Sequence, residues 1–290
     1  MPGKRLWLAL FFALLLVAGF PGAILAQQQT PEQLIARAQE AIQKKKYSDA
    51  EKHLKKALSL KKDSPEANLL LGVVYRDRVE IDKSFKHVRE AIRLQPNFPD
   101  AHYLLAFLYA IENQLDKSAE EVKIAIDQGA RFANIYIMKA NLEVRFSKHA
   151  DALDSYEMAL QLSQPSDSGY QKVSEQIESL KSYLAFQPLK DEFAKHKGDP
   201  AYKRPVLKNR PEPLYSTLAR AKKIQGTVRM SVRVNERGVA DKVLVSEGIG
   251  YGLDEEAVKA VRTAKFSPAM RNGEPVMYWM PVIIEFRIRQ

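Results

Sequence analysis

Three glycines near the C-terminus stand where a phosphate-binding loop would stand. Gly248, Gly250 and Gly252 lie between a predicted strand and a predicted helix, and this placement is typical of loops that hold phosphate groups. However, neither register supplies the third small residue of the dinucleotide-binding fingerprint, because Leu253 or Glu255 occupies that position. The acidic start of the helix would also repel a phosphate. We therefore interpret the glycines as a tight connection rather than as a nucleotide site.

Other residue types that could do chemistry are too isolated to form a site. His53 and His87 fall at the same position of two successive sequence repeats, but no Cys or carboxylate pattern accompanies them as metal ligands would require. The chain has no Cys, and no Ser stands in a nucleophile elbow. The acidic pair Glu120-Glu121 lies in a Lys-rich helical stretch, which is typical of a solvated face. The sequence therefore predicts no catalytic residue, no metal site and no cofactor, and thus no enzyme.

The elements around the glycines form a short and recognisable series. In the run 226–234, Val228, Met230, Val232 and Val234 alternate with polar residues, which predicts a strand buried on one face. A turn at 235–238 leads to a second strand at 239–246, and a helix follows with Asp254 expected as its N-cap. A loop over 267–273 precedes a final alternating strand at 282–288. We expect one helix packed on a three-stranded antiparallel sheet.

Several sequence marks, in the same order, resemble the C-terminal domain of the TonB family. The resemblance covers roughly residues 206–290, under a third of the chain, and one departure is Ser216, where family members usually carry Pro. The marks are Tyr215, Ala219, Ile224-Gln225-Gly226-Thr227-Val228, Gly252-Leu253-Asp254-Glu255-Glu256-Ala257, Phe266-Ser267-Pro268-Ala269, Asn272-Gly273 and Pro275-Val276.

This resemblance implies a periplasmic module that grips a segment of an outer-membrane transporter and passes on force from the inner membrane. The family sheet has the order second, first, third strand, so a partner could add a strand beside the third. Pro281 agrees independently with an edge position, because Pro lacks the donor that a central strand needs. The candidate partner-binding residues on this strand are Val282, Ile283, Ile284, Glu285, Phe286, Arg287 and Ile288.

The region 31–166 contains four copies of a repeat of about 34 residues, which resembles the tetratricopeptide repeat. The copies start at Pro31, Pro65, Pro99 and Ala133. Small residues align at three positions, where helices must approach closely. They are Ala38, Gly72, Ala106 and Ala140; Ala50, Ser84, Ser118 and Ala152; and Ala57, Ala91, Ala125 and Ala159. The fold class expected is thus a helical solenoid followed by a small α+β domain.

The tetratricopeptide resemblance also implies a second candidate site on the concave side of the solenoid. It places Tyr103, Phe107 and Asn141 in a groove that could hold an extended peptide. The alternative is that these residues simply pack against the next repeat. Beyond the repeats, the stretch 170–197 is predicted to be a helix that caps the solenoid, and the proline-containing stretch 198–213 is predicted to be a stiff linker.

The N-terminus predicts export from the cytoplasm. Lys4 and Arg5 precede an apolar run, and Pro21-Gly22 breaks the run before Ala26, which indicates a signal peptide over 1–26. The alternative is an uncleaved inner-membrane anchor, since the run is just long enough to span. Either way the body of the protein would lie outside the cytoplasm, and the TonB resemblance implies the periplasm.

Charge is distributed unevenly along the chain. Residues 203–290 hold 17 Lys and Arg against 9 Asp and Glu, whereas the region 27–202 is balanced. Because an exported protein does not meet nucleic acid, we expect an anionic cell-wall or lipid contact, an acidic peptide, or simply a solvated surface for this basic domain.

The sequence therefore leads to two functional hypotheses. The first is a cell-envelope binding protein that resembles a TonB energy transducer and grips a partner segment, in support of outer-membrane transport. The second is a scaffold that uses its repeats to assemble envelope complexes. The chain lacks the long Pro-rich spacer of a complete TonB, and its apolar N-terminal run has no His for engaging a motor complex.

Overall fold

The computed structural model describes residues 29–209 and 211–288. The predicted signal peptide or anchor at 1–26 therefore lies outside the described residues. Within the two described ranges, no helix has the length and apolar character needed to cross a membrane.

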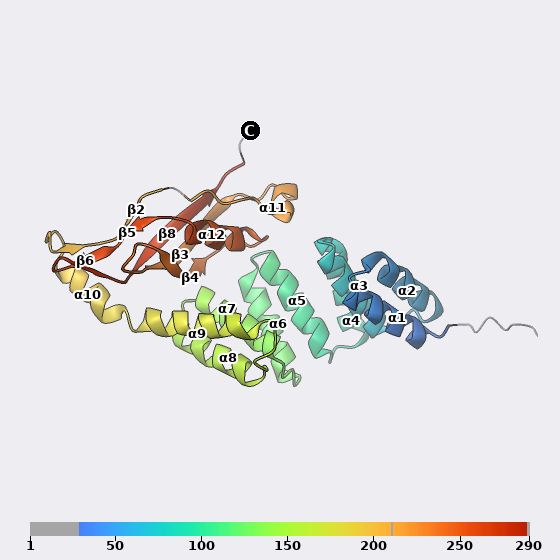
Figure 1. Ribbon diagram of the computed structural model, residues 1–290. Coiled ribbons are helices and arrows are strands. Elements are labelled where there is room, and N and C mark those ends of the chain that lie inside the picture. The colour runs from blue at the N-terminus through green and yellow to red at the C-terminus, as the bar shows by residue number, and fades with distance from the viewer. Residues whose placement is uncertain (1–28, 210, 289–290) are drawn as a thin grey trace, which may run out of the picture.

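Eight helices form four antiparallel pairs that stack into a solenoid (Figure 1). Three of the four first helices begin with a proline, which suits the first helical position because its missing N–H would have had no partner there. The helices are α1 (Pro31–Gln43), α2 (Tyr47–Leu60), α3 (Pro65–Asp77), α4 (Ile81–Leu94), α5 (Pro99–Ile111), α6 (Leu115–Asp127), α7 (Ala133–Arg145) and α8 (His149–Gln161). The predicted solenoid is confirmed.

The small residues lie at the helix contacts, as the repeat register requires. All eleven Ala and Ser residues of the three columns have no exposed surface, and Gly72 is buried with them. The Ser84 hydroxyl donates to the Gly72 carbonyl at 2.7 Å, and one repeat later the Ser118 hydroxyl donates to the Ala106 carbonyl at 2.8 Å. A Cβ on Gly72 would lie 2.5 Å from Val88 Cγ2. Larger side chains here would force the helices of a pair apart.

The turns inside the four pairs are also alike. Lys45, Val79, Asn113 and Ser147 follow one another at intervals of 34 residues, and each takes a left-handed φ between 55° and 63°. In each turn the next N–H bonds back to a carbonyl of the first helix, as Gln114 N does to Tyr109 O at 2.8 Å. Because the four turns are equivalent, they line up along one edge of the solenoid, here called the turn edge.

Two further helices follow the repeats. Helix α9 (Tyr170–Leu184) covers α8 with Val173, Ile177 and Leu180, all buried. Phe186, the N-cap residue of helix α10 (Gln187–Lys195), and Phe193 within this helix pack against Tyr278 of the last strand, with ring centroids 4.9 and 4.8 Å from that of the tyrosine. The stretch predicted as one capping helix is thus two helices, and the second reaches the C-terminal sheet.

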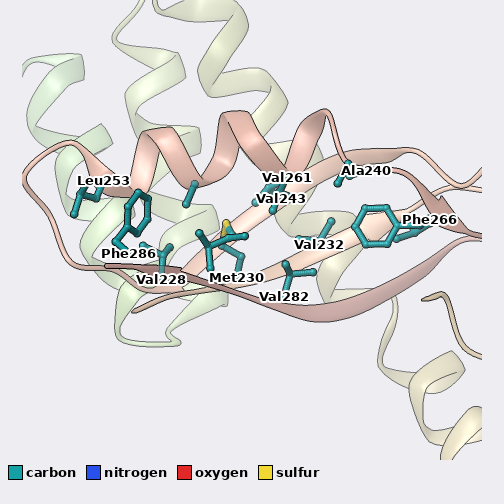
Figure 2. Packing of buried hydrophobic residues seen from close by; sticks show 14 of the residues in the cluster. Val228, Met230, Val232, Ala240, Val243, Leu253, Val261, Phe266, Val282 and Phe286 are labelled. Atoms are coloured by element: carbon teal, nitrogen blue, oxygen red, sulfur yellow. The ribbon is translucent and has the colours of Figure 1, made fainter. Parts of the chain in front are cut away.

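The C-terminal domain is one helix on a three-stranded antiparallel sheet, as predicted (Figure 2). The sheet has the order β4-β3-β8, so the last strand lies at an edge. Val228 and Met230 of the central strand, Val282 and Phe286 of the last strand, and Val261 of the helix form the core between them. The elements are β3 (Gly226–Val234), β4 (Ala240–Glu247), α12 (Leu253–Arg262) and β8 (Tyr278–Phe286).

Short strands extend this domain into segments that the sequence did not predict as strands. β1 (Tyr202–Lys203) and β2 (Val206–Leu207), inside the predicted linker, pair with β6 (Ala269–Arg271) and β5 (Phe266–Ser267). Strand β6 also pairs with β7 (Glu274–Val276), and Asn272 and Gly273 between them both take positive φ, as a two-residue hairpin turn requires. A short helix, α11 (Thr217–Ala221), precedes β3. The predicted linker therefore lies along the C-terminal domain.

The expectation that Asp254 caps helix α12 is wrong. Gly252, at φ 78°, is the N-cap, and Asp254 lies in the first turn of the helix. Its carboxylate instead accepts hydrogen bonds from the backbone N–H groups of Ile249 (2.7 Å) and Gly250 (3.2 Å). The same carboxylate pairs with Arg145 at 3.0 Å. The backbone of the glycine loop thus binds the Asp254 carboxylate, which also pairs with Arg145 of the repeats.

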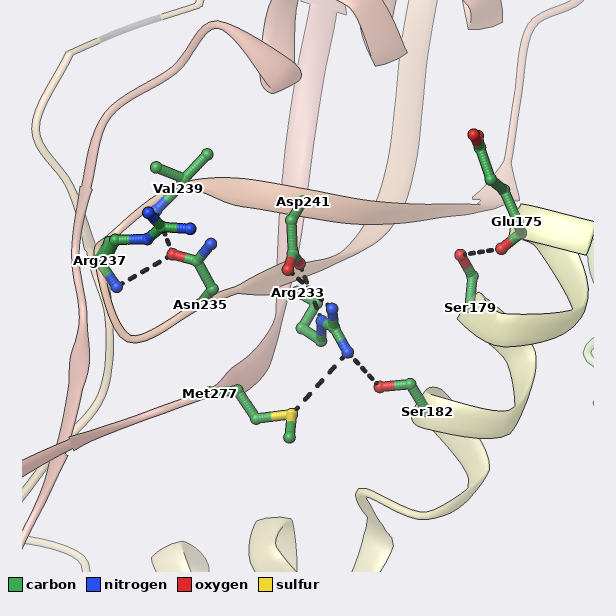
Figure 3. Close-up of polar contacts among 9 residues, drawn as sticks. All are labelled: Glu175, Ser179, Ser182, Arg233, Asn235, Arg237, Val239, Asp241 and Met277. Carbon is green, nitrogen blue, oxygen red and sulfur yellow. Dashed lines mark hydrogen bonds and ion pairs between the residues drawn. The ribbon is translucent and has the colours of Figure 1, made fainter. Parts of the chain in front are cut away.

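The C-terminal domain packs directly against the solenoid (Figure 1). The Tyr251 N–H donates to the Ile111 carbonyl at 2.6 Å, where α5 ends at the turn edge. Farther along the sheet, Leu244 and Trp279 join one apolar cluster with side chains of α7, α8 and α9. Figure 3 shows a polar contact of the same interface, where Arg233 pairs bidentately with Asp241 and donates to the Ser182 hydroxyl of α9 at 2.8 Å.

Candidate partner-binding site

Strand β8 pairs with β3 along one side, and no strand of the described residues pairs with its other side. Its side chains alternate as predicted. Val282, Ile284 and Phe286 are buried beneath α12, whereas Ile283 is 56% exposed and Glu285 is exposed with it. The buried side chains therefore hold the strand in place, and the side chains of its opposite face remain at the surface.

The free backbone groups of β8 can be identified from two hydrogen bonds. The Arg229 carbonyl accepts from the Ser246 hydroxyl and so points toward β4, away from its partner Ile283. The Ile288 N–H donates to the Gln225 side chain, on the β3 side. The backbone N–H and C=O groups of successive residues point to opposite sides of a strand. Those of the even-numbered residues of β8 therefore point toward β3, and those of the odd-numbered residues point outward. The outward N–H groups are those of Ile283, Glu285 and Arg287.

Pro281 falls on the same outward series. It stands opposite Ser231, and its missing N–H would point to solvent rather than to β3. The proline therefore costs no hydrogen bond within the sheet, and it interrupts the outward row of donors. A partner strand would find its donors in the segment from Ile283 onward.

The opposite edge of the sheet is covered. By the same alternation, the backbone of Val243 on β4 points away from β3, yet this residue is only 6% exposed. Helices α7 and α9 pack against β4. Docking on the solenoid thus leaves β8 as the accessible edge of this sheet.

A Tyr adds a polar atom near the end of this edge. The ring of Tyr215 contacts that of Phe286 edge-on, with centroids 5.5 Å apart. Its hydroxyl is buried and has no hydrogen-bond partner within 29–209 and 211–288, and burial raises the pKa of this phenol. A buried polar atom thus lies beside the C-terminal end of β8.

The three groove residues on the repeats are less available than the edge. Tyr103 packs edge-on against Phe132, with ring centroids 5.1 Å apart, and the Arg76 guanidinium lies 5.4 Å from the centre of the Phe107 ring. Asn141 is exposed, but its amide oxygen accepts a hydrogen bond from Tyr156 of its own repeat. Tyr103 and Phe107 both pack on an apolar cluster shared by the third and fourth repeats, so part of each ring is used for packing.

The contacts between the domains were not predicted from the sequence. Asp254 pairs with Arg145 at 3.0 Å, and both side chains are about 15% exposed. Lys222 pairs with Glu112 of the turn edge at 2.9 Å, and this hydrogen bond raises the pKa of the lysine. A Cβ on Gly250 would lie 2.6 Å from the Ile111 carbonyl oxygen. The glycine run was the signal in the sequence, but a close backbone contact more than 130 residues away cannot be read from local spacing.

Comparison with known proteins matches both the C-terminal domain and the repeats to known families. Residues 211–288 match the family model for the Gram-negative bacterial TonB protein C-terminal domain, and residues 35–101 match that for the tetratricopeptide repeat. Protein TonB of Vibrio cholerae serotype O1 is 30% identical over 94 residues, and protein tonB2 of Pseudomonas aeruginosa is 35% identical over 79 residues. These matches cover 29% and 27% of this chain, and only 38% and 29% of the two relatives.

The solved structures that resemble this chain are repeat proteins. A tetratricopeptide protein of Thermus thermophilus has a TM-score of 0.45 at 15% identity, covering 58% of this chain and 89% of its own. The structure of pilF of Pseudomonas aeruginosa has a TM-score of 0.48 at 17% identity, covering 59% and 78%. The two matched family models show that the chain carries tetratricopeptide repeats followed by a C-terminal domain of the TonB family.

Proposed function

We propose that this protein binds a segment of another cell-envelope protein by strand addition at β8, in support of outer-membrane transport. The observation that carries the proposal is the free edge itself, where Ile283, Glu285 and Arg287 present backbone N–H groups that no strand of the described residues uses. The match to the TonB C-terminal domain supports an envelope protein with a protein-binding role.

Binding at this edge would rest mainly on the main chain. Each backbone hydrogen bond contributes about 0.5–1.5 kcal/mol net, so three bonds supply at most about 4.5 kcal/mol, which corresponds to a Kd of about 1 mM. The exposed Ile283 side chain would add apolar burial against the incoming strand. The Arg287–Glu285 ion pair, 2.7 Å long and exposed, would contribute little.

The test replaces one outward donor and leaves the sheet intact. Glu285→Pro removes an outward N–H and places a ring in the path of the partner strand, while the pairing of β8 with β3 remains, as it does at Pro281. We expect binding to a peptide derived from an outer-membrane transporter to fall at least about tenfold. Glu285→Ala keeps the N–H and should change the affinity less than about threefold. Titration calorimetry measures both, after circular dichroism has verified the fold.

The scaffold hypothesis is the second candidate, because the ring faces of Tyr103 and Phe107 are only partly covered. In that case a folded Glu285→Pro variant would capture its partners from envelope extract as well as the wild type does. Tyr103→Ala with Phe107→Ala would instead abolish capture. This pair of results would reject strand addition and move the binding site to the repeats.

A further inference from the structure

Three short segments of the C-terminal domain, around Lys208, Lys265 and Val239, lie side by side and form one small surface. The Lys208 N–H donates to the Lys265 carbonyl at 2.7 Å, which continues the β2–β5 ladder by one residue pair. Lys265 in turn forms an antiparallel bridge with Val239. Gly238 permits this approach, because a Cβ there would lie 2.3 Å from the Phe266 carbonyl oxygen.

The two sides of this surface differ sharply. Leu207 and Phe266 point inward to the core of the domain. Cross-strand neighbours share a face, so Val206, Lys208, Lys265 and Val239 point outward together. All four are exposed, and the valines are 63% and 46% exposed. Arg237 is exposed at the tip of the adjoining turn, beside Val239 (Figure 3). We call these five residues the amphipathic face.

The charges of this face are not compensated within the domain. Lys208 and Lys265 stand directly opposite each other, and like charges in this arrangement destabilise a strand pair. Among the described residues, neither lysine forms an ion pair, and Arg237 forms none. The acid of the same turn, Glu236, is exposed and also unpaired there. An anionic partner would relieve this repulsion.

We propose that the amphipathic face binds the surface of a bilayer that contains anionic phospholipid. Lipid phosphates would form ion pairs with Lys208, Lys265 and Arg237, and the two valines would insert at the boundary between headgroups and acyl chains. A soluble polyanion or wall polymer would satisfy the cations but leave both valines in water. The combination of exposed valines and unpaired cations on one face therefore favours a membrane. The proposal does not depend on strand addition at β8, because none of the five residues of the amphipathic face belongs to that strand.

Vesicle sedimentation with the full chain tests this proposal. The probes are vesicles of phosphatidylcholine alone and of phosphatidylcholine with about a third phosphatidylglycerol. The variant Lys208→Gln with Lys265→Gln should bind anionic vesicles about thirtyfold more weakly, from roughly 1 kcal/mol for each lysine near a charged surface. The matched control, Arg220→Gln with Lys223→Gln, removes the same charge from α11 and the turn after it and should bind as the wild type does. All proteins keep Lys4, Arg5 and the apolar run, so the N-terminal segment contributes equally.

A third variant separates the apolar contribution. Val206→Thr with Val239→Thr keeps the charge and the side-chain shape, and we expect it to weaken binding to anionic vesicles severalfold even in high salt, where charge attraction is screened. An equal loss for the Arg220 and Lys223 control, or no loss for Lys208→Gln with Lys265→Gln, overturns the proposal. The proposal is also overturned if the wild type binds purified cell wall and the valine variant binds vesicles with the same affinity as the wild type. The amphipathic face would then be a binding site for a wall polymer.

Discussion

At the scale of single residues, Gly250 explains the loop that first looked like a phosphate site. Its φ of 78° alone would favour glycine, but the stronger constraint is the Ile111 carbonyl oxygen, which leaves no room for a Cβ. The residue therefore serves contact between domains. The sequence alone predicts a tight connection at these glycines and thus only a local role.

A pair of glycine substitutions separates backbone strain from this contact. Gly129 also has a positive φ, of 96°, but nothing lies within 4 Å of a Cβ placed there. Gly129→Ala should cost about 1 kcal/mol of unfolding free energy from backbone strain alone. Gly250→Ala should cost distinctly more, because it must also displace the loop from Ile111. Denaturant unfolding of both variants measures the difference. Equal losses of unfolding free energy would show that the loop moves away from Ile111 at no measurable cost.

At the scale of elements, periodicity predicted most of the fold. The eight repeat helices, the main helix of the C-terminal domain and the first two long strands lie close to where alternation or the repeat register placed them, because each buries a continuous apolar face. The last strand, predicted at 282–288, instead runs from Tyr278 to Phe286. Its first residues escaped prediction because Trp279 is buried against the solenoid, so that no polar residue alternates there. The sheet order followed from the resemblance and from Pro281. Strands of two or three residues, such as β1 and β2, escaped prediction because two residues carry no measurable alternation.

The small-residue columns give a prediction about the packing of the repeats. Ala106 has no exposed surface, and its carbonyl accepts the Ser118 hydroxyl. Ala106→Leu should overpack this contact and cost about 1–3 kcal/mol of unfolding free energy. Lys117→Ala, on the exposed face of α6, should change it by less than about 0.5 kcal/mol. Thermal unfolding followed by circular dichroism measures both, and similar shifts in Tm would contradict the register.

At the scale of the whole molecule, the sequence could not show how the domains sit against each other. The groups that join them, such as Arg145 with Asp254 and Lys222 with Glu112, lie more than 100 residues apart. Each looks like an ordinary surface charge in its own segment. The candidate edge could therefore be named from the sequence, whereas the covering of the other edge could not.

Limited proteolysis tests the connection between the domains. We expect the first cut between Lys197 and Pro213, since the paired stretches in this segment are only two residues long. After the cut, the two fragments should still elute together in size-exclusion chromatography, because Tyr251, Arg145 and the apolar cluster around Trp279 remain in contact. A first cut inside the repeats would contradict the division into domains, and separate elution would contradict a stable interface.

The covered strand β4 has one more consequence, which concerns self-association. A sheet with two open edges can add copies at both sides and grow into an open-ended fibre. Because α7 and α9 pack against β4, this sheet can pair with another copy only through β8. Two chains that met there would use up both of their free edges, and growth would stop at a pair. The repeats thus protect the protein from the aggregation that an exposed apolar strand invites.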